Sequence, residues 1–137
     1  MKVMFDTNIY IGWIRKGEFS DLLTDYQTRK YLSAVVLSEL WAGARKKPAA
    51  RLVTRLQEPY QKSGRIITLS IEDYIMLGQA LSDLPERHLP RMAAASFVND
   101  LAIALTARKI GAILYTCNRA DFTVVSEVLP GVTYLFL

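Results

Sequence analysis

The sequence predicts an α/β protein in which helices cover both faces of a mostly parallel sheet. Short apolar runs of strand length recur along the chain. They alternate with longer stretches of helical periodicity, an order typical of a parallel sheet with helical crossovers. No internal repeat and no linker interrupts this alternation, so we expect residues 1–137 to form a single domain.

The first half of the chain is expected to begin with a buried strand. Val3, Met4 and Phe5 form an apolar run that stops at Asp6. Pro48 lies early in a later helical stretch, where a proline is tolerated. The expected elements are a strand at 2–5, helices at 7–14 and 18–29, a strand at 31–36, a helix at 37–44, a helix that starts near Pro48, and a strand at 65–69.

The second half is expected to start with a helix opened by a capping box. Ser70 and Asp73 have the spacing of that motif. Residues 97–109 predict a helix that is apolar on two sides and therefore buried on both, with Gly111 as its C-cap. An irregular connection is expected at 85–95, and strands at 112–116 and 132–136. The helix after Ser70 carries an apolar stripe made of Ile71, Tyr74, Ile75, Gly78, Leu81 and Leu84.

Composition limits the class of protein. Of 137 residues, 51% are hydrophobic and 22% charged, which excludes a disordered chain and provides enough apolar surface for a core. The single cysteine, Cys117, excludes an internal disulfide and is expected to be a small buried residue. No signal peptide and no membrane span is visible. These features favour the reducing cytoplasm.

The chain is basic, with a formal net charge of +4, and its basic residues are partly clustered. Such clusters can contact a polyanion, or they can be a solvated helix face and a polar loop. His88, the only histidine, is expected to be a surface residue rather than a ligand. The first cluster contains Arg45, Lys46, Lys47, Arg51 and Arg55, and the second contains Arg87, His88 and Arg91.

Acidic residues stand in unusually apolar surroundings at Asp6, Glu39 and Asp100. Buried carboxylates are costly unless they are protonated, paired or bound to a metal ion. No basic residue has helical spacing that clearly pairs these three. A fourth acid, Asp121, follows the predicted strand at 112–116. Their surroundings make these acids candidates for a functional site.

The predicted topology brings the four acids together. Ligands of open parallel sheets bind beyond the carboxyl ends of the strands. Asp6 and Asp121 follow strands directly, and Glu39 and Asp100 lie near the starts of helices. A cluster of carboxylates without histidine or cysteine spacing suits Mg²⁺ or Mn²⁺. Such an ion can activate water and stabilise the charge on a phosphate, while a basic rim holds a nucleic-acid backbone.

Each acid also has a structural interpretation when it is taken alone. Asp6 can be a helix N-cap, and Asp121 can cap a turn. Glu39 can reach water from a half-buried helix, and Asp100 can complement a helix dipole. The functional interpretation depends on the set, because four independent caps need not meet at one sheet edge.

Four segments of the chain resemble the PIN domain family, and in particular its VapC toxin branch. They are Met4–Asn8, Ser38–Leu40, Asn99–Ala104 and Thr116–Phe122, and their order, spacing and total length are similar to that branch. The resemblance covers nearly the whole chain apart from 42–95, where no signature is found. At Asn118 some family members carry an acid, which leaves the number of bound metals open.

The resemblance implies a three-layer α/β/α fold and a metal-dependent endoribonuclease, the toxin of a toxin–antitoxin pair. Asp6, Glu39, Asp100 and Asp121 would be catalytic and hold Mg²⁺ or Mn²⁺, supported by Thr7, Thr116 and Asn118. The implied partners are an RNA substrate, a small antitoxin whose tail enters the acidic crevice, and a second copy in a homodimer. The basic residues considered for RNA contact are Arg45, Lys46, Arg87 and Arg91.

Two other functions fit parts of the pattern. A phospho-receiver domain also has a parallel sheet and an acidic Mg²⁺ pocket. It would need paired acids after the first strand, where this chain has Asp6-Thr7-Asn8, and a lysine near the last strands. A catalytically silent PIN-like module that binds RNA or a partner is the second alternative. Carboxylates that face phosphates would not help such a module.

Overall fold

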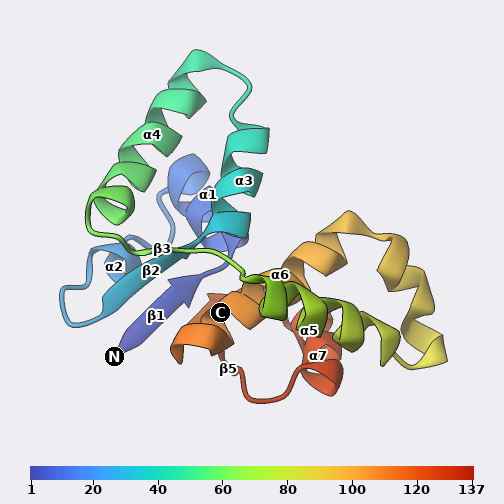
Figure 1. The fold of residues 1–137 in the computed structure, drawn as a ribbon. Coiled ribbons are helices and arrows are strands. Elements are labelled where there is room, and N and C mark those ends of the chain that lie inside the picture. The colour runs from blue at the N-terminus through green and yellow to red at the C-terminus, as the bar shows by residue number, and fades with distance from the viewer.

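The computed structural model describes residues 1–137 and contains one sheet of five strands in the order β3-β2-β1-β4-β5 (Figure 1). Every neighbouring pair of strands is parallel. This confirms the predicted α/β class. The strands are β1 (Lys2–Phe5), β2 (Arg29–Ser33), β3 (Ile66–Ile67), β4 (Ile113–Thr116) and β5 (Thr133–Phe136).

Helices cover both faces of the sheet. The chain moves from β1 to β2 and β3 in one direction and then returns to β4 and β5 on the other side of β1. Right-handed crossovers therefore place the first four helices on one face and the later ones on the opposite face (Figure 1). The first set is α1 (Thr7–Lys16), α2 (Ser20–Thr24), α3 (Ala34–Gly43) and α4 (Lys47–Lys62). The second is α5 (Ile71–Ser82), the 3₁₀ helix η1 (Glu86–Ala93), α6 (Ala95–Ile110) and α7 (Arg119–Val128).

The strand order also distinguishes this protein from a phospho-receiver domain, one of the alternatives considered from the sequence. A phospho-receiver domain has the order 2-1-3-4-5, whereas this sheet has the order 3-2-1-4-5. The direction of the connections changes between β1 and β4, so we expect the crevice for a ligand at the carboxyl ends of these two strands. The residues that follow β1 and β4 are therefore placed to form a site.

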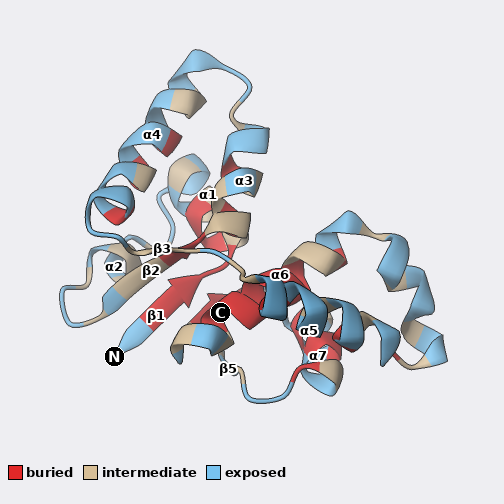
Figure 2. Ribbon diagram, in the orientation of Figure 1, coloured by how far each residue is buried: buried red, intermediate tan, exposed pale blue.

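The core is centred on β1 and α6 (Figure 2). Val3, Met4 and Phe5 are almost fully buried, as expected of a central strand. Every residue of α6 from Asp100 to Ala107 is buried, which confirms the prediction of a helix covered on two sides. Gly111 ends α6 in the left-handed region at φ 69°, as the C-cap prediction requires. No helix is both long and apolar enough to cross a membrane.

Several predicted boundaries are wrong, and local hydrogen bonds explain two of them. The helix expected at 18–29 is only α2, because the Asp25 side chain accepts a hydrogen bond from the Gln27 N–H and the chain turns into β2. The strand expected at 31–36 ends at Ser33, whose hydroxyl accepts from the Val35 N–H and caps α3. The strand expected at 65–69 is reduced to Ile66–Ile67.

Two further expectations are corrected. The connection expected to be irregular contains η1, and α7 forms after Asn118, where no helix was assigned. Only the end of the predicted apolar stripe faces the core: Ile71, Tyr74 and Ile75 are exposed, whereas Leu81 packs against the core and Leu84 is buried. The capping box predicted at Ser70 and Asp73 is present with both of its hydrogen bonds.

Candidate functional site

The candidate site begins where β1 and β4 end side by side. The Asp6 N–H donates to the Tyr115 carbonyl at 2.9 Å, which extends the pairing of these strands by one residue. The buried Thr116 hydroxyl then donates to Asp6 Oδ2 at 2.7 Å. Thr116, the last residue of β4, thus fixes the carboxylate of Asp6, which directly follows β1.

The Asp6 carboxylate is buried and has further donors. Its Oδ1 accepts from the Thr7 N–H at 2.7 Å, and its Oδ2 accepts from Asn8 Nδ2 at 3.0 Å. Burial raises the pKa of Asp6, although these hydrogen bonds oppose that rise. Asp6 therefore caps α1 and also stands in the crevice, so the two interpretations of this residue do not exclude each other.

Glu39, from the middle of α3, turns toward the same crevice. Its Oε1 accepts from the Thr7 hydroxyl at 2.7 Å, and its Oε2 accepts from Asn99 Nδ2 at 3.5 Å. The side chain is half-buried and links the middle of α3 to the starts of α1 and α6. Glu39 therefore does not simply extend into solvent, because both of its carboxylate oxygens accept hydrogen bonds from other side chains.

The opposite wall is organised by Asn118, the N-cap of α7. Its side-chain amide donates to Asp100 Oδ2 at 3.3 Å and to Asp121 Oδ2 at 3.0 Å. Its Oδ1 accepts from the Asp121 N–H at 3.2 Å, and its own N–H donates to the Thr116 hydroxyl at 2.9 Å. Asn118 thereby bridges the carboxylates of Asp100 and Asp121.

Asp100 carries the strongest electrostatic signal of the site. Burial raises the pKa of this carboxyl to about 8, and the negative charges of Asp6, Asp121 and Glu39 contribute to the rise. The structure therefore brings the other three acids named from the sequence within electrostatic reach of Asp100.

The carboxylates are at present held by protein donors. No group of three or more acidic, histidine or cysteine side chains is positioned to hold a metal ion directly. Asn8, Asn99 and Asn118 donate to the acids, and the Arg91 guanidinium pairs with Asp121. The donor set of carboxylate, amide and hydroxyl oxygens is of the type that Mg²⁺ and Mn²⁺ prefer.

Asn8 and Asn99 were not among the site residues named from the sequence. Asn8 donates to Asp6, and its Oδ1 accepts from the Cys117 N–H at 3.3 Å, which ties the two strand ends together. Each lies beside a named residue, Asn8 next to Thr7 and Asn99 next to Asp100. Both also lie in segments that resemble the PIN domain family, Met4–Asn8 and Asn99–Ala104, and this position was the sequence signal that could have identified them.

Replacing Asn118 is expected to affect both stability and the site. Asn118→Ala removes the N-cap of α7, which should lower the free energy of unfolding by about 1 kcal/mol. It also leaves Asp100 and Asp121 without their shared donor, so any activity of the site should fall. Ser70→Ala is the matched control, because it removes a cap of α5 outside the acidic crevice. Urea denaturation and activity measured on both variants check this, and equal activities would contradict it.

A sequence model of the PIN domain matches residues 3–128. The chain belongs to the PIN domain family. The match includes all four acids of the crevice. The recognition made from the sequence is therefore confirmed, together with the three-layer fold that it implied.

Solved structures with a similar fold cover this PIN domain from end to end. VapBC2 from Rickettsia felis, bound to a DNA fragment from their promoter, is 25% identical, with a TM-score of 0.68 over 100% of this chain and 99% of that chain. VapBC-1 from nontypeable Haemophilus influenzae is 22% identical, with a TM-score of 0.70 over 99% of this chain and 98% of that chain. DNA-bound VapBC from Salmonella typhimurium is 24% identical, with a TM-score of 0.68 over 99% of this chain and 98% of that chain. No curated protein sequence matches the chain closely.

The basic residues named for RNA contact divide into two groups. Arg45 and Lys46 are exposed in the turn between α3 and α4. Arg87 pairs with Glu127 at 3.0 Å, and Arg91 pairs with Asp121, so both are engaged by α7. Cys117 is exposed rather than buried, because it follows the last residue of β4 in the loop that leads to α7.

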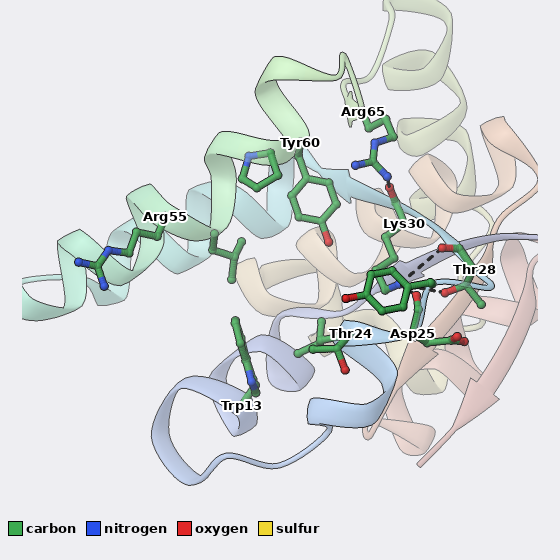
Figure 3. Close-up of a pocket in the computed structure, with 12 residues that line it drawn as sticks. Trp13, Thr24, Asp25, Thr28, Lys30, Arg55, Tyr60 and Arg65 are labelled. Carbon is green, nitrogen blue, oxygen red and sulfur yellow. Dashed lines mark hydrogen bonds between the residues drawn. The ribbon is translucent and has the colours of Figure 1, made fainter.

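A separate pocket of about 460 Å³ lies apart from the acids, between α1, α2, β2 and α4 (Figure 3). Trp13 and Tyr60 provide aromatic walls, and Arg55 extends at one end. None of the four acids of the crevice lines it.

Proposed function

We propose that this PIN domain is a metal-dependent endoribonuclease that hydrolyses RNA phosphodiester bonds in the crevice formed by Asp6, Glu39, Asp100 and Asp121. The observation that carries the proposal is the gathering of the four acids around Asp100: burial raises the pKa of that carboxyl to about 8, and the negative charges of Asp6, Asp121 and Glu39 add to the rise. A protein keeps such a cluster at a cost to its stability, and a cation removes that cost.

The bound metal is proposed to be Mg²⁺ or Mn²⁺, held by some or all of the four carboxylates. Such an ion would lower the pKa of an attacking water and stabilise negative charge on a phosphate in an in-line displacement. The residues of the chain provide the geometry: Thr116 and Asn8 fix the Asp6 carboxylate, and Thr7 fixes Glu39. Asn118 holds Asp100 and Asp121 at a set separation.

RNA is proposed to reach the crevice past the basic turn between α3 and α4. Arg45 and Lys46 are exposed there and form no ion pair, so they are available to phosphates. Arg87 and Arg91 are proposed to contribute less to this rim, because acidic residues of α7 already neutralise them.

A catalytically silent module remains the second candidate function. The raised pKa of Asp100 argues against it, since a surface that only binds RNA gains nothing from four gathered carboxylates. Phosphodiester hydrolysis, which a silent module cannot perform, separates the two candidates.

The direct test uses an RNA oligonucleotide and a DNA oligonucleotide of the same sequence. Purified protein is incubated with each strand in Mn²⁺ and in EDTA. We expect the RNA to be cut in Mn²⁺ only and the DNA to remain intact. Binding of RNA without cleavage in Mn²⁺ would favour the silent module, and equal cutting of DNA would overturn the assignment of RNA as substrate.

The partners are proposed to be an antitoxin and a second copy of the chain, in the cytoplasm. The resemblance to the VapC branch supports the antitoxin, and the structural relatives named VapBC agree with it. The antitoxin tail is proposed to enter the acidic crevice. The second copy is supported by α5, where Ile71 is 77% exposed, Tyr74 60% and Ile75 56%. An uncharged apolar stripe of this kind can pair with its own copy across a two-fold axis.

Introducing charge on this stripe is expected to prevent self-association. Ile71→Lys together with Ile75→Lys should convert a dimer into a monomer, because two like-charged stripes would then face each other. Leu52→Lys is the control, since Leu52 is also exposed but lies on α4. Sedimentation equilibrium measures the mass of each variant. A dimer that survives the double substitution would place the interface elsewhere.

A further inference from the structure

The 3₁₀ helix η1 lies beside the acidic crevice, and its basic side chains point at α7. Arg87 Nη2 lies 3.0 Å from Glu127 Oε2, and His88 Nε2 lies 3.7 Å from Glu127 Oε1. Arg91 pairs with Asp121, one of the four acids proposed to hold the metal. The segment therefore contacts α7 at two places, and only the Arg91 contact involves the candidate site.

The Arg91 contact is built by several groups. Asp121 Oδ1 receives the guanidinium, while Asp121 Oδ2 accepts from Asn118 Nδ2 at 3.0 Å. The Arg91 guanidinium also lies 5.9 Å from the centre of the Phe97 ring, a cation–π contact with the first turn of α6. Only about a third of each partner's side chain is exposed, at 35% for Arg91 and 28% for Asp121. Both oxygens of Asp121 are thus occupied by protein donors.

A guanidinium is charged at every accessible pH and donates hydrogen bonds without accepting any. It can neutralise Asp121 but cannot share that oxygen with a metal ion. The other three acids have no basic partner of this kind in the structure. Arg91 is therefore the one fixed positive charge paired within the cluster.

We propose that Arg91 is an internal competitor of the divalent metal: it neutralises Asp121 while the site is empty and must leave Asp121 before that carboxylate can ligate the ion. This inference rests on the proposed metal site. Arg91 then sets the metal affinity, because each binding event breaks one ion pair before it forms a metal bond. The wild-type chain consequently binds metal more weakly than its four acids alone would allow.

The test is a calorimetric titration of Mn²⁺ into three purified proteins without RNA. Arg91→Met removes the competing charge and keeps a flexible apolar stem against Phe97. Arg87→Met is the matched control, because it removes the neighbouring contact to Glu127 and leaves the acidic cluster untouched. We expect Arg91→Met to bind Mn²⁺ about tenfold more tightly than wild type, a difference of about 1.4 kcal/mol. Arg87→Met should bind as wild type does.

Other outcomes have distinct meanings. Equal affinity in all three proteins, or weaker binding by Arg91→Met, would overturn the role of Arg91 and leave the metal site standing. An absence of Mn²⁺ binding in every folded protein would overturn the metal site itself. If Arg91→Met fails to fold, Arg91→Lys replaces it, because lysine keeps the charge but loses the forked geometry. Affinity that is tighter in Arg91→Lys than in wild type supports the competition, and unchanged affinity contradicts it.

Discussion

Asp100→Asn is expected to lower the rate of RNA cleavage by about a thousandfold while making the metal-free protein more stable at alkaline pH. The loss of activity follows from the removal of one of the proposed metal-holding carboxylates. The gain in stability follows from the pKa of Asp100, which rises from 3.8 to about 8 on folding. An uncharged amide of similar shape escapes both the burial cost and the repulsion from Asp6, Asp121 and Glu39.

The sign of the stability change depends on pH. Between about pH 4 and pH 8 the folded protein keeps a proton on Asp100 that the unfolded chain has lost. The metal-free wild type should therefore lose stability as the pH rises through this window. Asp100→Asn should lose less, and thermal denaturation in EDTA at both ends of the window measures the difference. A variant that is inactive but no more stable than wild type at about pH 8 would show that the charge cluster does not strain the fold.

Divalent metal is expected to raise the melting temperature of the wild type. At about 100 times its dissociation constant, a ligand of the native state adds about 2.7 kcal/mol, which corresponds to about 8 °C in a chain of this size. The effect should be larger near pH 8 than near pH 6, because binding requires Asp100 to be ionised. Differential scanning fluorimetry with Mn²⁺ and with Mg²⁺ measures this shift.

A matched acid outside the crevice controls for general metal effects. Asp73 is a buried carboxylate in the capping box of α5 and pairs with Lys109 at 2.8 Å. Asp73→Asn should keep the full metal-induced shift, although its starting melting temperature is lower. Asp100→Asn should lose most of the shift. A response to metal that is equal in wild type and Asp100→Asn would place the ion elsewhere on the protein.

The fold class and the convergence of the acids could be predicted from the sequence because both depend on order and topology. Once strands and helices alternate, residues at the carboxyl ends of the strands meet at one edge of the sheet, as Asp6 and Thr116 do. The early end of β2 could not be predicted, because it depends on the Ser33 hydroxyl capping α3. The shortness of β3 had no signal in the sequence either. Glu39 and Asp100 were selected from their apolar surroundings in the sequence, and the family resemblance implied the same set.

The supporting contacts were less accessible to sequence reasoning. Arg91 lies 30 residues from Asp121, so no helical spacing reveals their ion pair. Asn8 and Asn99 are polar residues beside acids, a pattern that local capping explains equally well. The exposure of the α5 stripe could not be predicted either, because helical periodicity shows that a face is apolar but not what covers it.

The most direct test of the metal-dependent nuclease is cleavage of a mixed RNA pool by wild type and Asp100→Asn, purified in parallel and incubated with Mn²⁺ or with EDTA. We predict that the wild type cuts RNA in Mn²⁺, that EDTA stops it, and that Asp100→Asn is inactive in both conditions. Cleavage that is equal in the two proteins, or that survives EDTA, would contradict the assignment of the acidic crevice as a metal-dependent ribonuclease site.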